Sequence, residues 1–305
     1  MKRIFKAALF LLIPAGLSGQ LSPVSNQYVL NPLTVNPAFA GNRGVLNLAA
    51  FYKKQWVGVK GAPETMTLTA DAPLLDNKMG LGLVFINDRI GVTKENYLLT
   101  NYAYNLKLGE GTLSLGLGAG IITTNTAWSD LVVLDPGDDL YLVDSRKFIL
   151  PSFSFGTYYT NHNYFLGFSI PRFIGYKFNY DKNKYSLTVD PSQYNFMLNT
   201  GYAFNLSPKV DFVPSTMLSL TPGRKMLVDL NAHLNFNDKF WLGAAYRNAR
   251  SFGALFQLQV NNQFKVAYTY DFDLGKLAGY SNGTHEIMLR YEFRYKVNVV
   301  NPLIF

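Results

Sequence analysis

The chain has 305 residues, no cysteine, a formal charge of +8, and a composition that is 15% aromatic and only 16% charged. Soluble proteins carry about 25% charged residues, and the scattered basic residues form no stripe that would bind nucleic acid. We therefore expect no nucleic-acid partner, and without cysteine the fold cannot depend on disulfides.

The first 19 residues have the pattern of a secretory signal peptide. Met1, Lys2 and Arg3 are followed by an apolar run over 7–17 and by small residues at 18 and 19. The run is too short to span a membrane, which takes about 20 residues. We expect cleavage near Gly19, to within a residue or two. Three basic residues leave with the signal, so the mature chain keeps a charge of about +5.

Residues 20–43 contain two Asn-Pro pairs, Asn31-Pro32 and Asn36-Pro37. Each proline lacks a backbone donor and pushes the preceding asparagine toward extended or turn geometry, which predicts an ordered loop rather than a regular element. Two interpretations remain open. The segment, with Tyr28 among its apolar anchors, is either a structured plug or docking surface for a periplasmic partner, or a loose periplasmic leader.

From residue 44 onward, apolar and polar residues alternate in repeated runs, which is the period of β-strands. Most runs are about 9–13 residues long, which suits tilted strands crossing about 25 Å of hydrocarbon, whereas strands of soluble sandwiches usually have about 5–6 residues. About fourteen strands are predicted, near residues 44–54, 64–73, 79–88, 97–107, 112–124, 148–160, 164–172, 194–206, 209–220, 224–236, 239–248, 253–260, 264–273 and 285–295.

The predicted connections alternate in length along the chain. Every second one is short, and the others are generally longer, including 87–96 and two stretches of about 20 residues at 125–147 and 173–193. This alternation is typical of outer-membrane barrels. A membrane protein without a long apolar helix can only be a closed barrel. We therefore predict an all-β fold, a transmembrane antiparallel β-barrel over 44–305 in the outer membrane of a Gram-negative bacterium, with both termini periplasmic.

Several predicted strands carry charged or polar residues on one face. A charge facing lipid costs about 2–4 kcal/mol near the midplane, so we expect these residues to face the lumen. Such a lumen suits either an aqueous pore or an ion-pair network around a plug. The lumen candidates are Asp229, His233, Arg290, Glu292 and Arg294.

Catalytic and metal-binding patterns are not recognisable in the sequence. His162, His233 and His285 are far apart, and His285-Glu286 lacks the second histidine of a zinc-protease helix. The aspartates between 130 and 144 do not follow the twelve-residue calcium loop, and no serine lies in a nucleophile elbow. We predict a non-enzymatic protein without a cofactor or a bound metal.

The long loops carry more apolar side chains than solvated loops usually do. Trp56 lies in the first loop, and Trp128, Leu131 and Val133 lie in the third. They are interpreted as a protein-binding surface or as a cover over the lumen. For Trp56, an aromatic belt at the membrane interface is the simpler alternative.

Four blocks of the sequence resemble one protein family. They are "QYVLNPLTVNPAFAG" at 27–41, "QWVGVKGAPETMTLTADAPL" at 55–74, "YDFDLGKLAGYSNGTHEIMLRYEF" at 270–293 and "NPLIF" at the C-terminus. They are similar to the PorP/SprF family, outer-membrane proteins of the type IX secretion and gliding machinery, and the resemblance covers essentially the whole mature chain.

The resemblance implies a barrel that supports secretion and surface attachment of large adhesins. Its implied partners are the C-terminal sorting domain of a secreted adhesin or cargo protein, a periplasmic ring lipoprotein, or a peptidoglycan-binding protein. No catalytic residue carries over. The partner-binding candidates, from the family blocks and the apolar loops together, are Tyr28, Asn31, Pro32, Asn36, Pro37, Gln55, Trp56, Trp128, Leu131 and Val133.

Three classes of function follow from these patterns. The family blocks, the Asn-Pro segment and the apolar loops favour an interaction protein of the secretion machinery. A channel or transporter for small or hydrophobic solutes is the alternative, because charged lumen residues would also suit a pore. A hydrolase would need a nucleophile–base pair, which the sequence does not reveal.

Overall fold

The computed structural model describes residues 28–130, 144–179, 184–248, 250–275 and 278–293. The expected signal peptide and the candidates Leu131, Val133 and Arg294 lie outside the described residues. In the described ranges, no helix is both long enough and apolar enough to cross a membrane.

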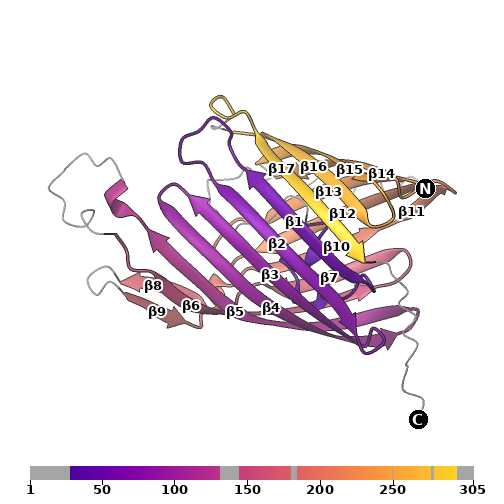
Figure 1. Ribbon diagram of the computed structural model, residues 1–305, viewed down its shortest axis with the longest axis horizontal. Coiled ribbons are helices and arrows are strands. Elements are labelled where there is room, and N and C mark those ends of the chain that lie inside the picture. Colours follow the sequence, from indigo (N-terminus) through magenta and orange to yellow (C-terminus); the bar gives the residue numbers. More distant parts are fainter. Residues whose placement is uncertain (1–27, 131–143, 180–183, 249, 276–277, 294–305) are drawn as a thin grey trace, which may run out of the picture.

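Seventeen strands are present in the described chain, and most are long and antiparallel to their neighbours (Figure 1). They are β1 (Leu46–Lys54), β2 (Glu64–Leu74), β3 (Met79–Ile90), β4 (Thr93–Leu108), β5 (Gly111–Thr126), β6 (Phe148–Thr160), β7 (Tyr164–Ile170), β8 (Gly175–Asn179), β9 (Lys184–Thr188), β10 (Phe196–Tyr202), β11 (Phe204–Ser207), β12 (Val210–Leu220), β13 (Leu227–Phe236), β14 (Phe240–Arg247), β15 (Ser251–Gln259), β16 (Phe264–Asp273) and β17 (Thr284–Phe293).

The sheet closes into a barrel because its first and last strands pair. β1 pairs with β17, and β10 pairs with β7 on one side and with β12 on the other. β10 and β11 are two parts of one wall strand, interrupted at Ala203, and both pair with β12. The wall therefore has fourteen strands, which confirms the predicted fold class.

Side chains alternate between the two faces of the wall, as the sequence period predicts. On β13, Asp229, Asn231 and His233 are buried toward the lumen, and Leu230, which lies between them, is half exposed on the outer face. Large exposed apolar side chains recur on nearly every wall strand. The outer face therefore has the apolar character that hydrocarbon requires.

The prediction of a loop at 87–96 is wrong. β3 and β4 continue through it and leave only Gly91 and Val92 as a turn, in which Gly91 has φ +57°. Asn87 and Asn96 are cross-strand partners, and the Asn87 amide donates to Asn96 Oδ1 at 2.7 Å. Strands β4 and β5 have 16 residues each, more than the about 9–11 needed to cross a bilayer. Their outer ends extend beyond the hydrocarbon, so their polar composition does not exclude a strand.

A second difference concerns the predicted loop 173–193. It contains the two-stranded sheet β8–β9, which is separate from the wall, and a short 3-10 helix at Pro191–Gln193. Each strand of this sheet has only five residues. Runs this short give no clear period in the sequence.

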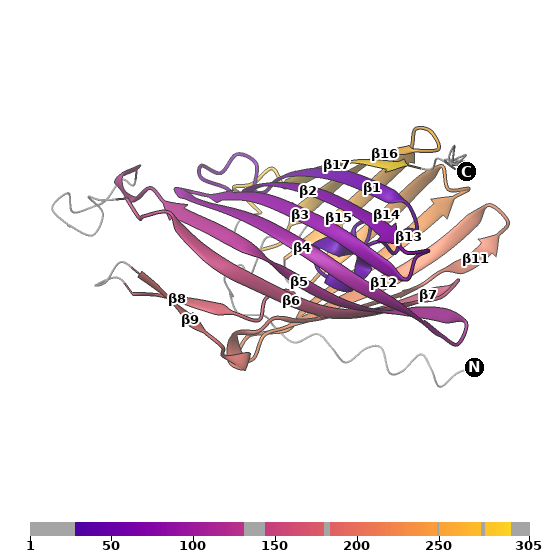
Figure 2. The same cartoon turned by 60° about the horizontal axis from the view of Figure 1, so that its bottom comes forward.

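Residues 28–43, here called the inner segment, lie inside the barrel (Figure 2). Two single-turn 3-10 helices form there, η1 (Pro32–Thr34) and η2 (Pro37–Phe39), and each begins at the proline of an Asn-Pro pair. Proline suits the first helical position because its fixed φ is already helical and its missing N–H would have no partner there. The Asn36 side chain caps η2 by accepting a hydrogen bond from Ala38 N at 3.0 Å.

The depth of the apolar band can be tested with two outward-facing leucines of equal exposure. Leu117, in the middle of the span of β5, and Leu206, next to the β11–β12 turn, are each 61% exposed. We expect Leu117→Arg to lower the free energy of unfolding in lipid bilayers by about 2–4 kcal/mol, and Leu206→Arg by about 0–1 kcal/mol. Denaturant titration of the refolded barrel measures both. Equal costs would contradict the assigned membrane depth.

Candidate functional site

The inner segment contacts the barrel wall on three sides. One apolar cluster joins it to β3, β4 and β6, a second joins it to β1, β15, β16 and β17, and a third joins it to β10 and β12. It therefore crosses the lumen instead of following one wall. Its side chains in these clusters are Leu33, Ala38, Phe39 and Ala40 in the first, Leu30 in the second, and Tyr28 and Val35 in the third.

Glycines of the wall make room for this close approach. A Cβ at Gly116 on β5 would lie 2.1 Å from Ala38 N, and one at Gly80 on β3 would lie 1.9 Å from Ala40 O. A Cβ at Gly156 on β6 would lie 2.0 Å from Asn36 Oδ1. Any other residue at these positions would force the segment or the wall to shift.

The two asparagines of the Asn-Pro pairs fasten the segment to the wall. Asn36 Nδ2 donates to Thr157 O on β6 at 3.0 Å and to Phe168 O on β7 at 3.3 Å. Asn31 Nδ2 donates to Thr69 Oγ1 on β2 at 2.8 Å. Both asparagines are almost completely buried, so losing either partner would leave a polar group unsatisfied.

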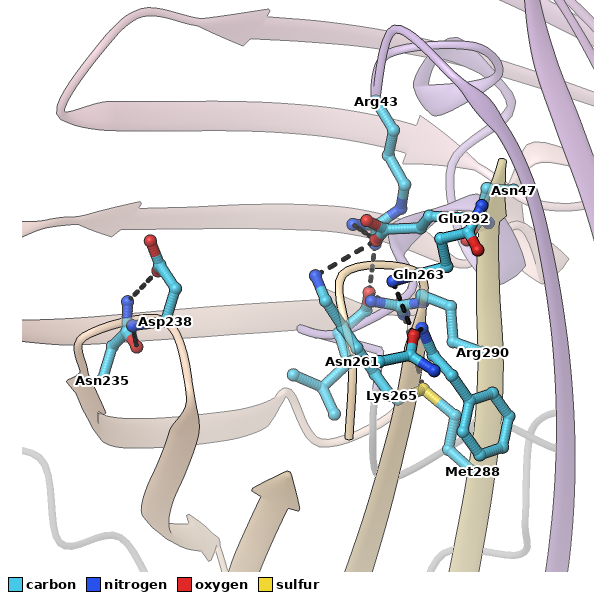
Figure 3. A network of polar contacts seen from close by, with 12 residues as sticks. Arg43, Asn47, Asn235, Asp238, Asn261, Gln263, Lys265, Met288, Arg290 and Glu292 are labelled. Atoms are coloured by element: carbon cyan, nitrogen blue, oxygen red, sulfur yellow. Dashed lines mark hydrogen bonds and ion pairs between the residues drawn. The ribbon is translucent and has the colours of Figure 1, made fainter. Parts of the chain in front are cut away.

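A cluster of charges joins the end of the inner segment to the last two wall strands (Figure 3). Glu292 on β17 forms an ion pair with Lys265 on β16 at 3.2 Å and lies 4.0 Å from the Arg43 guanidinium. Both Arg43 and Arg290 donate to Leu30 O. The wall strands therefore hold the inner segment at two places, the Arg43 side chain and the Leu30 carbonyl.

Asp71 adds a second anchor beside this cluster. Its Oδ2 accepts a hydrogen bond from Gly41 N at 3.2 Å, and its Oδ1 accepts one from Asn47 Nδ2 at 2.7 Å. Gly41 has φ +69°, and a Cβ there would lie 2.8 Å from Ala72 O. The chain can therefore turn from the inner segment into β1 only with glycine at this position.

Another polar group lies on the far side of the inner segment, toward the long loops. The Tyr28 hydroxyl accepts from Asn231 Nδ2 at 2.7 Å, and Arg247 pairs with Asp229 at 2.7 Å. Lys53, only 7% exposed, interacts electrostatically with several carboxylates of the wall. In the described parts of the chain, no three histidine or carboxylate side chains come together as a metal site would need.

Four of the lumen candidates lie on the inner face of the wall. Asp229, His233, Arg290 and Glu292 are each at most 6% exposed. The structure separates them into the two polar groups, with Asp229 on the Tyr28 side and Arg290 and Glu292 around Arg43. His233 packs beneath Gly243, where a Cβ would lie 2.2 Å from its ring.

The partner-binding candidates of the inner segment are not at a surface. Tyr28, Asn31 and Asn36 are at most 2% exposed, and Pro32 and Pro37 are buried. In this position their side chains contact the barrel wall and could reach a partner only if the segment moved. That they bind a partner stays a prediction.

The loop candidates lie at the end of the barrel that carries the long loops. Gln55 is buried, and Trp56 and Trp128 are half-buried. The loop after β1 is joined to the loop before β17, since Val57 N donates to Gly283 O at 2.9 Å and Asn282 N donates to Val57 O at 2.7 Å. Two blocks that are far apart in the sequence therefore form one surface.

Sequence reasoning missed the residues that hold the inner segment in place. Arg43 and Asp71 attach it, and Gly80, Gly116 and Gly156 accommodate it. Glycines at every second position of "LGLGAG" on β5 were a usable signal, because they place one smooth face along the strand. The period of the sequence does not indicate which segment packs on that face.

Comparison with known proteins identifies one family. The model of a family described as type IX secretion system membrane protein PorP/SprF matches residues 17–291. No curated protein sequence matches the chain.

Solved structures with a similar fold include the outer-membrane protein Omp33 of Acinetobacter baumannii, with a TM-score of 0.50 and 8% identity over 82% of this chain and 100% of that one. The CymD monoaromatic hydrocarbon channel has a TM-score of 0.48 and 10% identity over 89% and 94% of the two chains. A FadL homologue of Pseudomonas aeruginosa has a TM-score of 0.43 and 13% identity over 92% and 96%. At these identities the likeness to Omp33 concerns the fold alone, that of an outer-membrane barrel.

The fit between glycine and inner segment can be tested with one methyl group. We expect Gly116→Ala to displace η2, because its Cβ would lie 2.1 Å from a backbone atom. The expected cost is about 1–3 kcal/mol, measured by thermal unfolding. In an Ala38→Cys background, the new thiol should become accessible to maleimide in native membranes.

Gly279→Ala is the matched control, because a Cβ there meets no atom within 4 Å. It should leave both the stability and the labelling of Ala38→Cys unchanged. If the thiol of Ala38→Cys reacts as slowly in the Gly116→Ala variant as in the Gly279→Ala control, the close packing is contradicted.

The buried charge cluster can be compared with an exposed ion pair. We expect Glu292→Gln to cost about 3–5 kcal/mol, because it leaves buried cations without their carboxylate. Glu64→Gln removes the partner of Lys54 from a pair whose side chains are 47% and 38% exposed, so it should cost about 0–1 kcal/mol. Denaturant titration of both variants measures the difference. Similar values would show that the cluster does not hold the segment.

Proposed function

This chain belongs to the PorP/SprF family of type IX secretion system membrane proteins, and on that premise we propose that it works by binding proteins rather than as an open pore. It is an outer-membrane β-barrel. The single observation that carries the proposal is the inner segment, which crosses the lumen and packs against three sides of the wall.

Opening the lumen would require breaking the contacts of the inner segment. It would separate Arg43 from Glu292, which stays paired with Lys265 on the wall, and it would take Leu30 O away from Arg290. The asparagine hydrogen bonds and three apolar clusters would be lost as well. A state that lies several kcal/mol above the resting state is populated at roughly 1% or less. In the absence of a partner, we expect little flow of solutes.

The proposed binding surfaces are the two ends of the barrel. At the outer end, the loop that carries Trp56 is fastened to the loop before β17, and this arrangement holds the half-buried tryptophan in place. There we propose that the barrel binds the C-terminal domain of a large secreted adhesin or cargo protein. At the periplasmic end, the proposed partners are a ring lipoprotein or a peptidoglycan-binding protein of the same machinery.

A channel for small or hydrophobic solutes remains the second candidate. The observation that favours it is the charged lining on both sides of the inner segment, where Arg247 and Asp229 pair on one side and Lys265 and Glu292 on the other. If the inner segment moved away, these groups would line an aqueous passage. The two candidates differ in whether the lumen conducts when no partner is bound.

Single-channel recording and affinity capture together separate the two candidates. The mature protein, inserted in a planar bilayer, should show no sustained conductance, and deletion of residues 28–43 should produce a stable open channel. Capture of the tagged intact barrel from native outer membranes in mild detergent should recover a secreted protein with a C-terminal sorting domain or a periplasmic secretion component.

Other results of these measurements would contradict the proposal. Sustained conductance of the intact barrel, together with solute uptake that is lost on deleting the gene, would favour the channel. Unchanged surface adhesins and secreted proteins in the same deletion strain would remove the secretion role. A channel that stays closed after deletion of 28–43 would show that other residues block the lumen.

A further inference from the structure

A recess of about 380 Å³ lies at the loop end of the barrel, away from the inner segment. It is bounded by the outer ends of β4, β5 and β6, by the β8–β9 region and by the start of the loop after β12. Its volume falls within the about 300–1,000 Å³ typical of small-molecule sites. Because the short turns of outer-membrane barrels face the periplasm, this recess opens toward the outside of the cell.

Two arginines give the recess a positive character. Arg172 and Arg224 both line it, and no carboxylate in the described residues forms an ion pair with either. The one acidic residue of the lining, Glu95, accepts a hydrogen bond from the Tyr97 hydroxyl. Arg172 lies over the Tyr176 ring, 5.8 Å from its centroid, and this contact restrains the guanidinium. A guanidinium held in this way suits a carboxylate, phosphate or sulfate, and Arg224 adds a second positive charge to the lining.

A buried hydroxyl in the same lining has no partner. Thr221 is only 3% exposed, and its Oγ1 makes no hydrogen bond. A buried polar atom without a partner is costly, and each one in a folded protein calls for an explanation. A ligand that brings a hydroxyl or an anionic oxygen into the recess would satisfy Thr221.

Three tyrosines also line the recess, and neighbouring groups contact each of them. The Tyr176 hydroxyl donates to Pro151 O. Tyr185 packs edge-on against Phe148 with centroids 4.8 Å apart, and Tyr194 packs against a phenylalanine with centroids 6.0 Å apart. Restrained aromatic rings offer flat apolar surfaces with polar edges. Flat rings beside hydrogen-bonding groups match the two kinds of surface on a sugar.

We propose that this recess binds an acidic saccharide. The acidic group lies against Arg172 and Arg224, the sugar ring lies against the tyrosines, and a hydroxyl of the sugar pairs with Thr221. Two sources supply this chemistry at the cell surface: a free acidic polysaccharide, or the acidic sugars of the cell's own lipopolysaccharide. The site is independent of the inner segment, and its test does not depend on the secretion role.

Calorimetric titration of the intact mature barrel in detergent tests the proposal. The probes are a hyaluronan hexasaccharide, which carries uronic acid, the neutral chitin hexasaccharide, and inorganic phosphate. We expect hyaluronan to bind at least about tenfold more tightly than the chitin sugar, because only the former gives the arginines a charge-assisted partner. Phosphate should bind more weakly than hyaluronan, since it has no ring for the tyrosines.

Matched variants assign the binding to this recess. Arg172→Gln and Arg224→Gln should each weaken hyaluronan binding about tenfold, and Thr221→Val should weaken it by a smaller factor at nearly constant side-chain volume. Lys60→Gln is the control, since it removes one exposed positive charge from another outer loop. Heat-modifiable mobility on gels shows that each variant is a folded barrel.

The outcomes that overturn the proposal are distinct. Absence of hyaluronan binding, equal binding of the neutral sugar, or equal loss in Lys60→Gln would each contradict an acidic-saccharide site. Phosphate binding as tight as hyaluronan binding would indicate an anion site only. If deep-rough lipopolysaccharide displaces hyaluronan, the source is the cell's own surface, and if it does not, the source is a free polysaccharide.

Discussion

The absence of water in a bilayer is the constraint on which this structure depends. Each backbone N–H and C=O in hydrocarbon needs a partner within the protein, so a sheet that crosses the membrane must close. Closure here is made by β1 with β17 and by β10 with β12. Closure also separates two environments, apolar outside and enclosed inside. The enclosed side must then be filled with water or with protein.

In this chain, protein crosses the enclosed space. The inner segment cannot form a strand, because each Asn-Pro pair removes a donor and starts a 3-10 turn. Its buried asparagines therefore find partners on the wall. Glycines of the wall make room where the segment approaches it closely, Asp71 accepts a hydrogen bond from Gly41 N, and Glu292 lies beside the Arg43 guanidinium. These contacts couple the lumen to the first residues of β1, so movement of one would disturb the other.

The wall was predictable because its physical signal is local and repeated. Apolar side chains at every second position mark each long strand, and the lumen positions of Asp229 and Glu292 follow from the same period. The signal fails where a strand leaves the hydrocarbon, as at Asn87 and Asn96. It also fails for contacts between distant segments. The packing of Ala38 on Gly116 and the recess around Arg172 depend on three-dimensional proximity that no periodicity encodes.

Hydrogen exchange of the intact barrel in outer-membrane vesicles tests most directly whether the inner segment is a fixed part of the barrel. Backbone amides of this segment, such as those of Val35, Asn36 and Gly41, are hydrogen-bonded and buried in the structure. We expect peptides from 28–43 to exchange as slowly as peptides from the wall strands, because opening requires the loss of buried charge contacts. Exchange of 28–43 at the rate of an unstructured peptide, beside a protected wall, would contradict it.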